Sequence, residues 1–187
     1  MEDVVKVSAG MEIYDDDPVA KLTFEAFGIK YLFPWQRMVI SNILEAFEYQ
    51  KSLKDLSLEE RLIFDRENSD SFCKGRQIVL LPTGAGKSLC FMVPALFLDG
   101  PTLVIYPLLA LMSDQQRRME SGSLKSVVFK GGQSREEREE NFRKIENGYK
   151  VIIANPEVLG NDELVERLCK IGIRHVAIDE AHCVSEW

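Results

Sequence analysis

Residues 81–88 combine two glycines with a lysine and a hydroxyl group, between two apolar runs. This order predicts a strand, a tight turn and a helix. Gly84 and Gly86 allow the backbone to curl so that several N–H groups, and the positive end of the helix dipole, point at one anion. In such a loop Lys87 reaches the β- and γ-phosphates of a nucleotide, and the Ser88 hydroxyl holds Mg²⁺. The predicted loop residues are Thr83, Gly84, Ala85, Gly86, Lys87 and Ser88.

Two adjacent carboxylates near the end of the chain complement this loop. Asp179 and Glu180 end a short apolar run that begins at Val176. One carboxylate at such a position holds Mg²⁺, directly or through water, and the next orients and deprotonates the attacking water. An acidic loop after a core strand has the same residues, but its coincidence with a phosphate-binding loop favours catalysis. We therefore expect Asp179 to be the metal ligand and Glu180 the base, with Lys87 assisting.

The elements that must position these residues alternate in the manner of βαβ units. Strands are predicted at 76–81, 102–106, 126–130, 150–154 and 174–178, and helices at 87–98, 109–120, 135–147 and 162–171. The strands are almost continuously apolar, which is typical of a parallel sheet that is buried on both faces.

The first part of the chain reads as two helices. Asp17 and Pro18 predict the start of the first helix, and Gly28 predicts its end. A second helix begins near Pro34, and its apolar residues recur at helical spacing. The residues that we expect to face the core are Trp35, Val39, Ile40, Ile43, Leu44 and Phe47.

Four regions follow from these patterns: a loose arm at 1–14, a helical region at 15–50, a charged insertion at 51–74 and an α/β domain at 75–187. The insertion lacks a strong apolar stripe. Ser57 and Glu60 have the spacing of a capping box, so we expect a short surface helix there. The length of 187 residues fits one α/β domain with a sizeable core.

The composition limits partners and compartment. The net charge of −7 argues against non-specific nucleic-acid binding, so any such site must be confined. No Cys-x-x-Cys pair occurs among Cys73, Cys90, Cys169 and Cys183, and we expect reduced thiols in a cytoplasmic protein. Apolar runs stay shorter than the roughly 18 residues of a membrane span, and the acidic start does not resemble a secretory signal.

Five segments give the chain a family resemblance. They lie at 27–36, 82–90, 106–115, 154–157 and 179–187, and the last, Asp-Glu-Ala-His-Cys-Val-Ser-Glu-Trp, is the most specific. On these residues the chain resembles the first motor domain of RecQ-type DNA helicases, in helicase superfamily two. Leu81, where the usual loop pattern has glycine, is typical of helicase-type loops. The resemblance implies a P-loop NTPase fold, a RecA-like three-layer α/β sandwich with a mainly parallel central sheet, and it implies ATP and Mg²⁺ as cofactors.

The resemblance also implies an adenine-reading residue. Gln36 occupies the position where these helicases read adenine, and an amide can pair with N6 and N7 of that base. The chain departs from the family at Phe33, where a basic residue is usual, and at Trp35, where glycine is common. Stacking of Phe33 on the base is the alternative that this departure leaves open.

Four further residues acquire roles by resemblance alone. His182 would link the nucleotide site to the DNA site or to a second domain. Trp187 would begin an aromatic loop that senses single-stranded DNA, since an aromatic face can stack on an unpaired base. Pro107 and Asn155 lie in loops that would line the DNA path.

By this resemblance, the parent protein hydrolyses ATP, moves 3′ to 5′ along single-stranded DNA and unwinds duplexes in repair or recombination. It would do so near the nucleoid in bacteria or in the nucleus of eukaryotes. A second RecA-like domain would supply arginines to the γ-phosphate. We therefore expect this chain to be a fragment that binds nucleotide weakly and turns over little.

Two alternatives remain open. The chain can belong to another superfamily-two motor, an RNA helicase or a duplex translocase, with the same nucleotide chemistry. It can also be a nucleotide-binding interaction module that does not hydrolyse ATP. The presence of Lys87, Ser88, Asp179 and Glu180 together argues against the second alternative.

Overall fold

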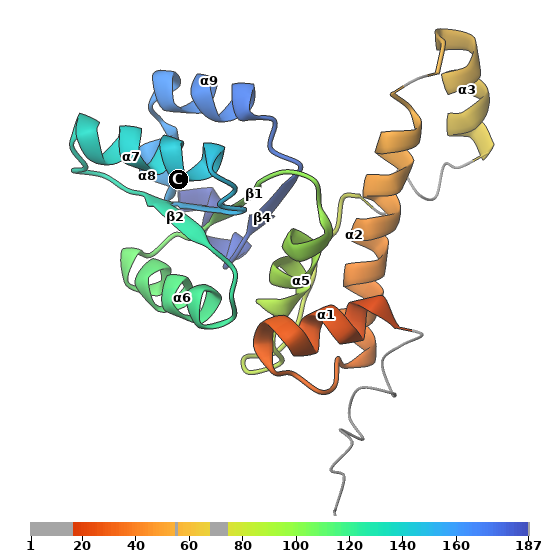
Figure 1. The fold of residues 1–187 in the computed structure, drawn as a ribbon, viewed down its shortest axis with the longest axis horizontal. Helices are drawn as coiled ribbons and strands as arrows, with labels where there is room; N and C mark the ends of the chain where they lie inside the picture. The colour runs from red at the N-terminus through yellow and green to blue at the C-terminus, as the bar shows by residue number, and fades with distance from the viewer. Residues whose placement is uncertain (1–16, 55, 68–74, 187) are drawn as a thin grey trace, which may run out of the picture.

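A four-stranded parallel sheet forms the centre of the protein (Figure 1). The computed structural model describes residues 17–54, 56–67 and 75–186, so the predicted arm at 1–14 lies outside the described residues. The strands are β1 (Thr102–Ile105), β2 (Ser126–Phe129), β3 (Val151–Ala154) and β4 (His175–Ile178), in the order β2-β3-β1-β4. Ile105 at the end of β1 is opposite Ala154 on one side and Ile178 on the other. The carboxyl ends of these three strands therefore meet at one edge of the sheet.

Helices cover both faces of this sheet (Figure 1). The helices of the described residues are α1 (Pro18–Phe27), α2 (Pro34–Ser52), α3 (Leu58–Glu67), α5 (Leu89–Phe97), α6 (Leu109–Ser121), α7 (Arg135–Glu146), α8 (Pro156–Leu159) and α9 (Asp162–Ile171), followed by a 3-10 helix, η2 (Ala181–Glu186). The helices α1 and α2 pack outside α5, and α3 lies away from the sheet (Figure 1). Leu103 and Ile105 pack with side chains of α7 and α9, whereas Val104 and Tyr106 pack with those of α5 and α6. Alternate residues of one strand thus enter opposite layers, as the two-residue period of a strand requires. This three-layer α/β architecture confirms the expected fold class.

The first two helices begin where the sequence predicts. The Asp17 side chain accepts a hydrogen bond from the backbone N–H of Ala20 at 2.9 Å, and Gly28 ends α1 in the left-handed region at φ 67°. Val39 and Ile40 of α2 are buried as expected. The expectation for Trp35 is wrong: its side chain is 39% exposed, because it stacks on Phe33 instead of entering the core. The predicted residues Ile43, Leu44 and Phe47 are half-buried, whereas Ala46 and Tyr49, which were not predicted, are buried.

The charged segment forms a surface helix, as predicted. Ser57 and Glu60 make both hydrogen bonds of the capping box at the start of α3, at 2.8 and 3.4 Å. None of the α3 residues is buried. The helix is attached to α2 through Tyr49, whose ring lies 5.4 Å from that of Phe64 and whose hydroxyl bonds the Asp65 carboxylate. The segment is therefore a decoration held by one end of α2, away from α1 (Figure 1).

One predicted strand is not present. Residues 77–81 have no ladder partner among the residues that the structure describes, and Ile78 and Leu80 are 91% and 90% exposed. A cavity of about 560 Å³ is lined both by this segment and by β4, whose Val176 and Ile178 are also exposed. The apolar run correctly marks an extended segment. It carries no information on the backbone partner, which a strand needs for its hydrogen bonds.

Within the described ranges, none of the helices combines the length and the apolar character that crossing a bilayer requires.

Candidate functional site

The predicted phosphate-binding loop forms a tight turn in front of α5. Gly84 and Gly86 have φ angles of 82° and 71°, a region in which a glycine carries no steric cost. The backbone N–H of Ala85 donates to the carbonyl of Pro82 at 3.2 Å, and that of Leu89 donates to the carbonyl of Gly86 at 3.1 Å. Ser88 is the residue before α5, and its side chain makes no capping hydrogen bond. The loop and the amino end of a helix therefore meet, as an anion site requires.

The acidic pair lies at the carboxyl edge of the sheet. The backbone N–H of Asp179 donates to the carbonyl of Ile105 at 3.0 Å, and Oδ1 of Asp179 accepts from the backbone N–H of Glu180 at 3.0 Å. Glu180 has a φ of 51°, which costs a residue other than glycine on the order of 1 kcal/mol. Its Oε2 lies 3.3 Å from Nδ1 of His182, a side chain that is 74% exposed. Strained backbone at a paired carboxylate is typical of a functional position.

Burial shifts the pKa of one group at each end of β4, Asp179 and His175. Burial raises the pKa of Asp179 above its ordinary value, and the charge of Glu180 acts in the same direction. The backbone N–H of Glu180 and the ammonium group of Lys87 oppose this shift. At the other end of β4, burial lowers the pKa of His175 to about 4, so that imidazole is neutral at pH 7. Asp179 is thus a carboxylate whose charged form would gain from a nearby cation.

Lys87 and the acidic pair line the same cavity of about 560 Å³, together with His182. Nζ of Lys87 donates to the carbonyl of Leu81 at 3.3 Å. This juxtaposition of an ammonium group with two carboxylates, beside a glycine loop at the start of a helix, can hold a polyphosphate and its counter-cation. The fold therefore brings together the three residues to which the sequence assigned catalysis.

Ser88 lies apart from this cavity. Ser88 lines a different cavity, together with Gly86 and Gln115. The Ser88 hydroxyl and the Asp179 carboxylate therefore do not line the same cavity. Their joint binding of Mg²⁺ stays a prediction. The donor atoms fit this ion, because it prefers oxygen ligands and usually takes most of them from phosphates and water. The described part of the chain contains no group of three or more His, Cys, Asp or Glu side chains that could hold a metal ion.

Gln36 anchors the phosphate-binding loop, a role that the sequence reasoning missed. Its Nε2 donates to the carbonyls of Ala85 and Gly86 at 3.2 and 3.1 Å, and its Oε1 accepts from the backbone N–H of Phe33 at 2.9 Å. The side chain is only 2% exposed. Its place three residues after Phe33 is that of a glutamine which caps a helix start, so the spacing signals the bond to Phe33 but not the two bonds to the loop. Reading of adenine by Gln36 stays a prediction, and it requires the amide to exchange these partners.

The residues expected near DNA lie at the same carboxyl edge, with one exception. Pro107 follows β1, and Asn155 follows β3. Asn155 is buried, its Nδ2 bonds the Glu157 carboxylate, and its Oδ1 has no partner within the described ranges. Trp187 lies outside the described residues. The DNA contacts of Pro107, Asn155, His182 and Trp187 stay predictions. Thr83, which was expected to bind nucleotide and not DNA, is exposed in the phosphate-binding loop.

The sequence of the chain is similar to those of known helicases. The sequence model described as DEAD/DEAH box helicase matches residues 34–187. The chain is 40% identical over 109 residues to the ATP-dependent DNA helicase RecQ of Bacillus subtilis, which covers 58% of this chain and 18% of that protein. It is 44% identical over 112 residues to the ATP-dependent DNA helicase Q-like 5 of Arabidopsis thaliana (59% and 12%). It is 41% identical over 112 residues to a putative ATP-dependent RNA helicase of Acanthamoeba polyphaga mimivirus (58% and 20%).

Proposed function

Because the chain belongs to the DEAD/DEAH box helicase family, we propose that it is the first motor domain of a RecQ-type ATP-dependent DNA helicase. One observation carries the nucleotide chemistry: Lys87, Asp179 and Glu180 line one cavity at the carboxyl edge of a parallel sheet. Ligands of open α/β sheets bind at this edge. The relatives named above are several times longer than the part that matches this chain, so their whole activity enters here only as a proposal.

The residues of the site divide the work. Lys87 leaves the carbonyl of Leu81 and binds the β- and γ-phosphates, while the amides around Gly86 hold the same phosphates. Glu180 accepts the proton of the attacking water, and His182 keeps that carboxylate oriented from 3.3 Å away. Asp179 and Ser88 are the residues that would hold Mg²⁺. The ion, when bound, neutralises charge on the phosphate oxygens.

The motor function needs more than this domain. We propose that a second RecA-like domain closes on the nucleotide and supplies an arginine, which contributes about 10³–10⁵ in rate. The isolated chain then binds ATP weakly and hydrolyses it slowly. In the complete protein, the edge with Pro107, Asn155 and His182 faces single-stranded DNA, movement is 3′ to 5′, and the protein acts in DNA repair and recombination.

Two substitutions test the nucleotide chemistry. Lys87→Ala removes the phosphate-binding ammonium, so we expect at least a tenfold weaker affinity of the 187-residue chain for a fluorescent ATP analogue with Mg²⁺. Glu180→Gln keeps the shape of the side chain, but its amide cannot accept a proton from the attacking water. We therefore expect unchanged affinity and, in a protein with both motor domains, turnover that is about 10²–10⁴-fold slower. Equal loss of affinity in both variants would show that these roles are assigned wrongly.

An RNA-directed motor is the second candidate, because one similar protein is described as a putative RNA helicase. The nucleotide chemistry would not differ. Stimulation of the ATPase of the complete protein by single-stranded DNA, duplex DNA and RNA separates these candidates. We expect the largest stimulation with single-stranded DNA.

A further inference from the structure

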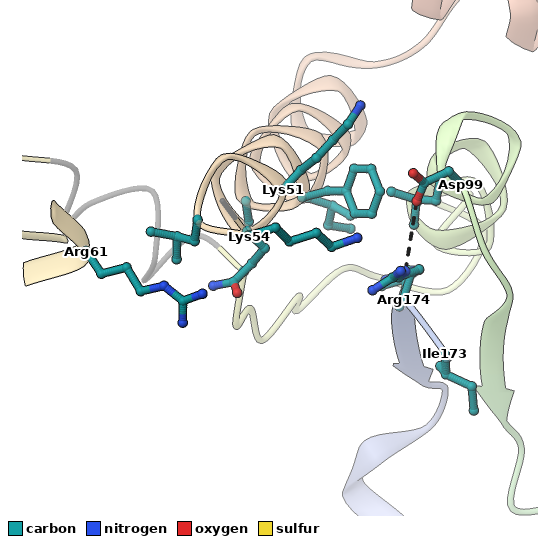
Figure 2. Close-up of a pocket in the computed structure, with 14 residues that line it drawn as sticks. Lys51, Lys54, Arg61, Asp99, Ile173 and Arg174 are labelled. Carbon is teal, nitrogen blue, oxygen red and sulfur yellow. Dashed lines mark ion pairs between the residues drawn. The ribbon is translucent and has the colours of Figure 1, made fainter. Parts of the chain in front are cut away.

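A second cavity, of about 490 Å³, lies at the amino edge of the sheet, where β4 begins (Figure 2). Four cationic side chains line it, against one carboxylate: Lys51, Lys54, Arg61 and Arg174, with Asp99. The whole chain carries a net charge of −7, so this local excess of positive charge is not a property of the surface as a whole. Such an excess favours an anionic ligand.

The cations come from three separate elements. Lys51 lies in the last turn of α2 and Lys54 follows it, Arg61 belongs to α3, and Arg174 precedes β4. In Figure 2 Lys54 extends towards the pair of Asp99 and Arg174, and Arg61 approaches from the other side. The surface helix α3 therefore completes the cavity that the sheet and α2 begin.

The positive charges are only weakly compensated. The Nε of Arg174 lies 3.9 Å from Asp99, and the Nζ of Lys51 lies 4.0 Å from Glu48, both at the limit of an ion pair. Lys54 has no ion-pair or side-chain hydrogen-bond partner among the described residues. Exposed pairs of this kind contribute little to stability, so a ligand can replace them at small cost.

Cations precede three of the four strands, but only one lines this cavity. Lys150 precedes β3, and its Nζ donates to the carbonyls of Leu96 and Leu98 at 3.3 and 3.0 Å. Lys125 precedes β2 and lies 5.6 Å from the ring of Tyr149. These two contacts account for Lys150 and Lys125 as supports of the fold, whereas Arg174 lines the cavity and lies 3.9 Å from Asp99.

The rest of the wall suits a nucleic-acid strand. It contains apolar side chains from α2, from its C-cap and from the approach to β4: Ile43, Phe47, Leu53 and Ile173. His175 also lines it, and its Nδ1 is buried without a hydrogen-bond partner in the part of the chain that is described. Apolar surface between separated cations can accept a base and sugar between successive phosphates, because stacking and phosphate contacts together bind single strands. A compact polyphosphate would use the charges but not the apolar wall.

We propose that this cavity at the amino edge is a second binding site for the phosphodiester backbone of single-stranded nucleic acid. The proposal rests on the proposed function in one respect, which is that a helicase produces single-stranded nucleic acid that could bind here. This second cavity adjoins the cavity of the nucleotide site, and both are lined by Ile43, Gly75 and His175. Its cations lie at the other end of β4 from the acidic pair, because the four residues of this strand, about 13 Å, separate Arg174 from Asp179. A strand bound here would be held at the edge of the sheet opposite to the acidic pair and to the predicted DNA loops.

The first test measures binding of a fluorescent single-stranded oligonucleotide of about twelve nucleotides to the 187-residue chain as salt is varied. Each phosphate contact contributes about 0.7 to the logarithmic salt slope, so loss of two contacts lowers the slope by about 1.4. We therefore expect Lys54→Ala with Arg174→Ala to weaken binding about 25-fold at 0.1 M salt. The matched control, Arg143→Ala with Lys170→Ala, removes two exposed cations outside this cavity and should weaken binding less than threefold. Equal losses in both double variants would overturn the proposal.

The second test locates the ligand directly. Acylation of lysine amines is followed by mass spectrometry, and the oligonucleotide should protect Lys51 and Lys54 at least fivefold while Lys170 stays reactive. Protection by poly-glutamate or by inorganic triphosphate that equals protection by the oligonucleotide would refute a strand-binding site. Affinity for the ATP analogue should be unchanged in Lys54→Ala with Arg174→Ala. A failure of this proposal is thereby distinguished from a failure of the nucleotide site, which Lys87→Ala reports.

Discussion

Replacement of Gln36 by alanine tests whether this residue holds the phosphate-binding loop against α2. The side chain is 2% exposed and makes three hydrogen bonds, two as donor to Ala85 and Gly86 and one as acceptor from Phe33. Each neutral hydrogen bond contributes about 0.5–1.5 kcal/mol to stability. The substitution should therefore lower the free energy of unfolding by about 3 kcal/mol, which is a large share of the 5–15 kcal/mol of a typical domain.

Urea unfolding followed by circular dichroism measures this loss. Gln116→Ala is the matched control, because its amide makes one exposed hydrogen bond to Glu120 at 3.0 Å, and its effect should stay within about 0.5 kcal/mol. Gln36→Glu should destabilise more than Gln36→Ala, since a carboxylate would face two carbonyl oxygens in a buried place.

The same variants separate loop anchoring from adenine reading. If the amide anchors the loop, affinity for ATP and for GTP should fall together in Gln36→Ala, along with stability. If the amide reads adenine, the preference for ATP over GTP should disappear. A Gln36→Ala variant that is as stable as Gln116→Ala would refute the anchoring role.

Two further substitutions concern the loop and the acidic pair. Gly86→Ala should weaken binding of the ATP analogue at least tenfold, because its Cβ would lie 2.5 Å from Nε2 of Gln36 and the φ of 71° disfavours alanine. Gly148→Ala, with φ of 88° but open space around its Cβ, should cost about 1 kcal/mol of stability and leave nucleotide affinity unchanged. Burial raises the pKa of Asp179, so the folded protein keeps that proton to a higher pH than the unfolded chain does, and stability falls as pH rises above 3.8. Asp179→Asn should therefore increase the free energy of unfolding at pH 7, with the gain vanishing below about pH 4 in urea titrations; a gain that is constant across pH would contradict this cause.

Local patterns in the sequence were sufficient for much of this protein. Gly84 and Gly86 adopt the positive φ angles that their spacing predicts, and Asp17, Gly28 and Ser57 end or begin helices where expected. These features depend on a few neighbouring residues, so the chain encodes them wherever it folds. The apolar strands likewise predicted a parallel sheet buried on both faces, which is confirmed for β1, β2 and β3. It is wrong for β4, whose Val176 and Ile178 are exposed.

Tertiary structure alone decided how distant segments meet. No local pattern distinguishes the buried Gln36 from an exposed glutamine, because its partners Ala85 and Gly86 are distant in the sequence. Among the described residues the extended segment at 77–81 has no ladder partner, which its apolar residues could not reveal, since pairing depends on which backbone lies alongside. Lys54 and Arg174 look like ordinary surface cations in the sequence, and they line one cavity only because α2 ends beside the start of β4. Periodicity and capping act over a few residues, whereas burial, charge clustering and cavity shape arise from the packing of the whole chain.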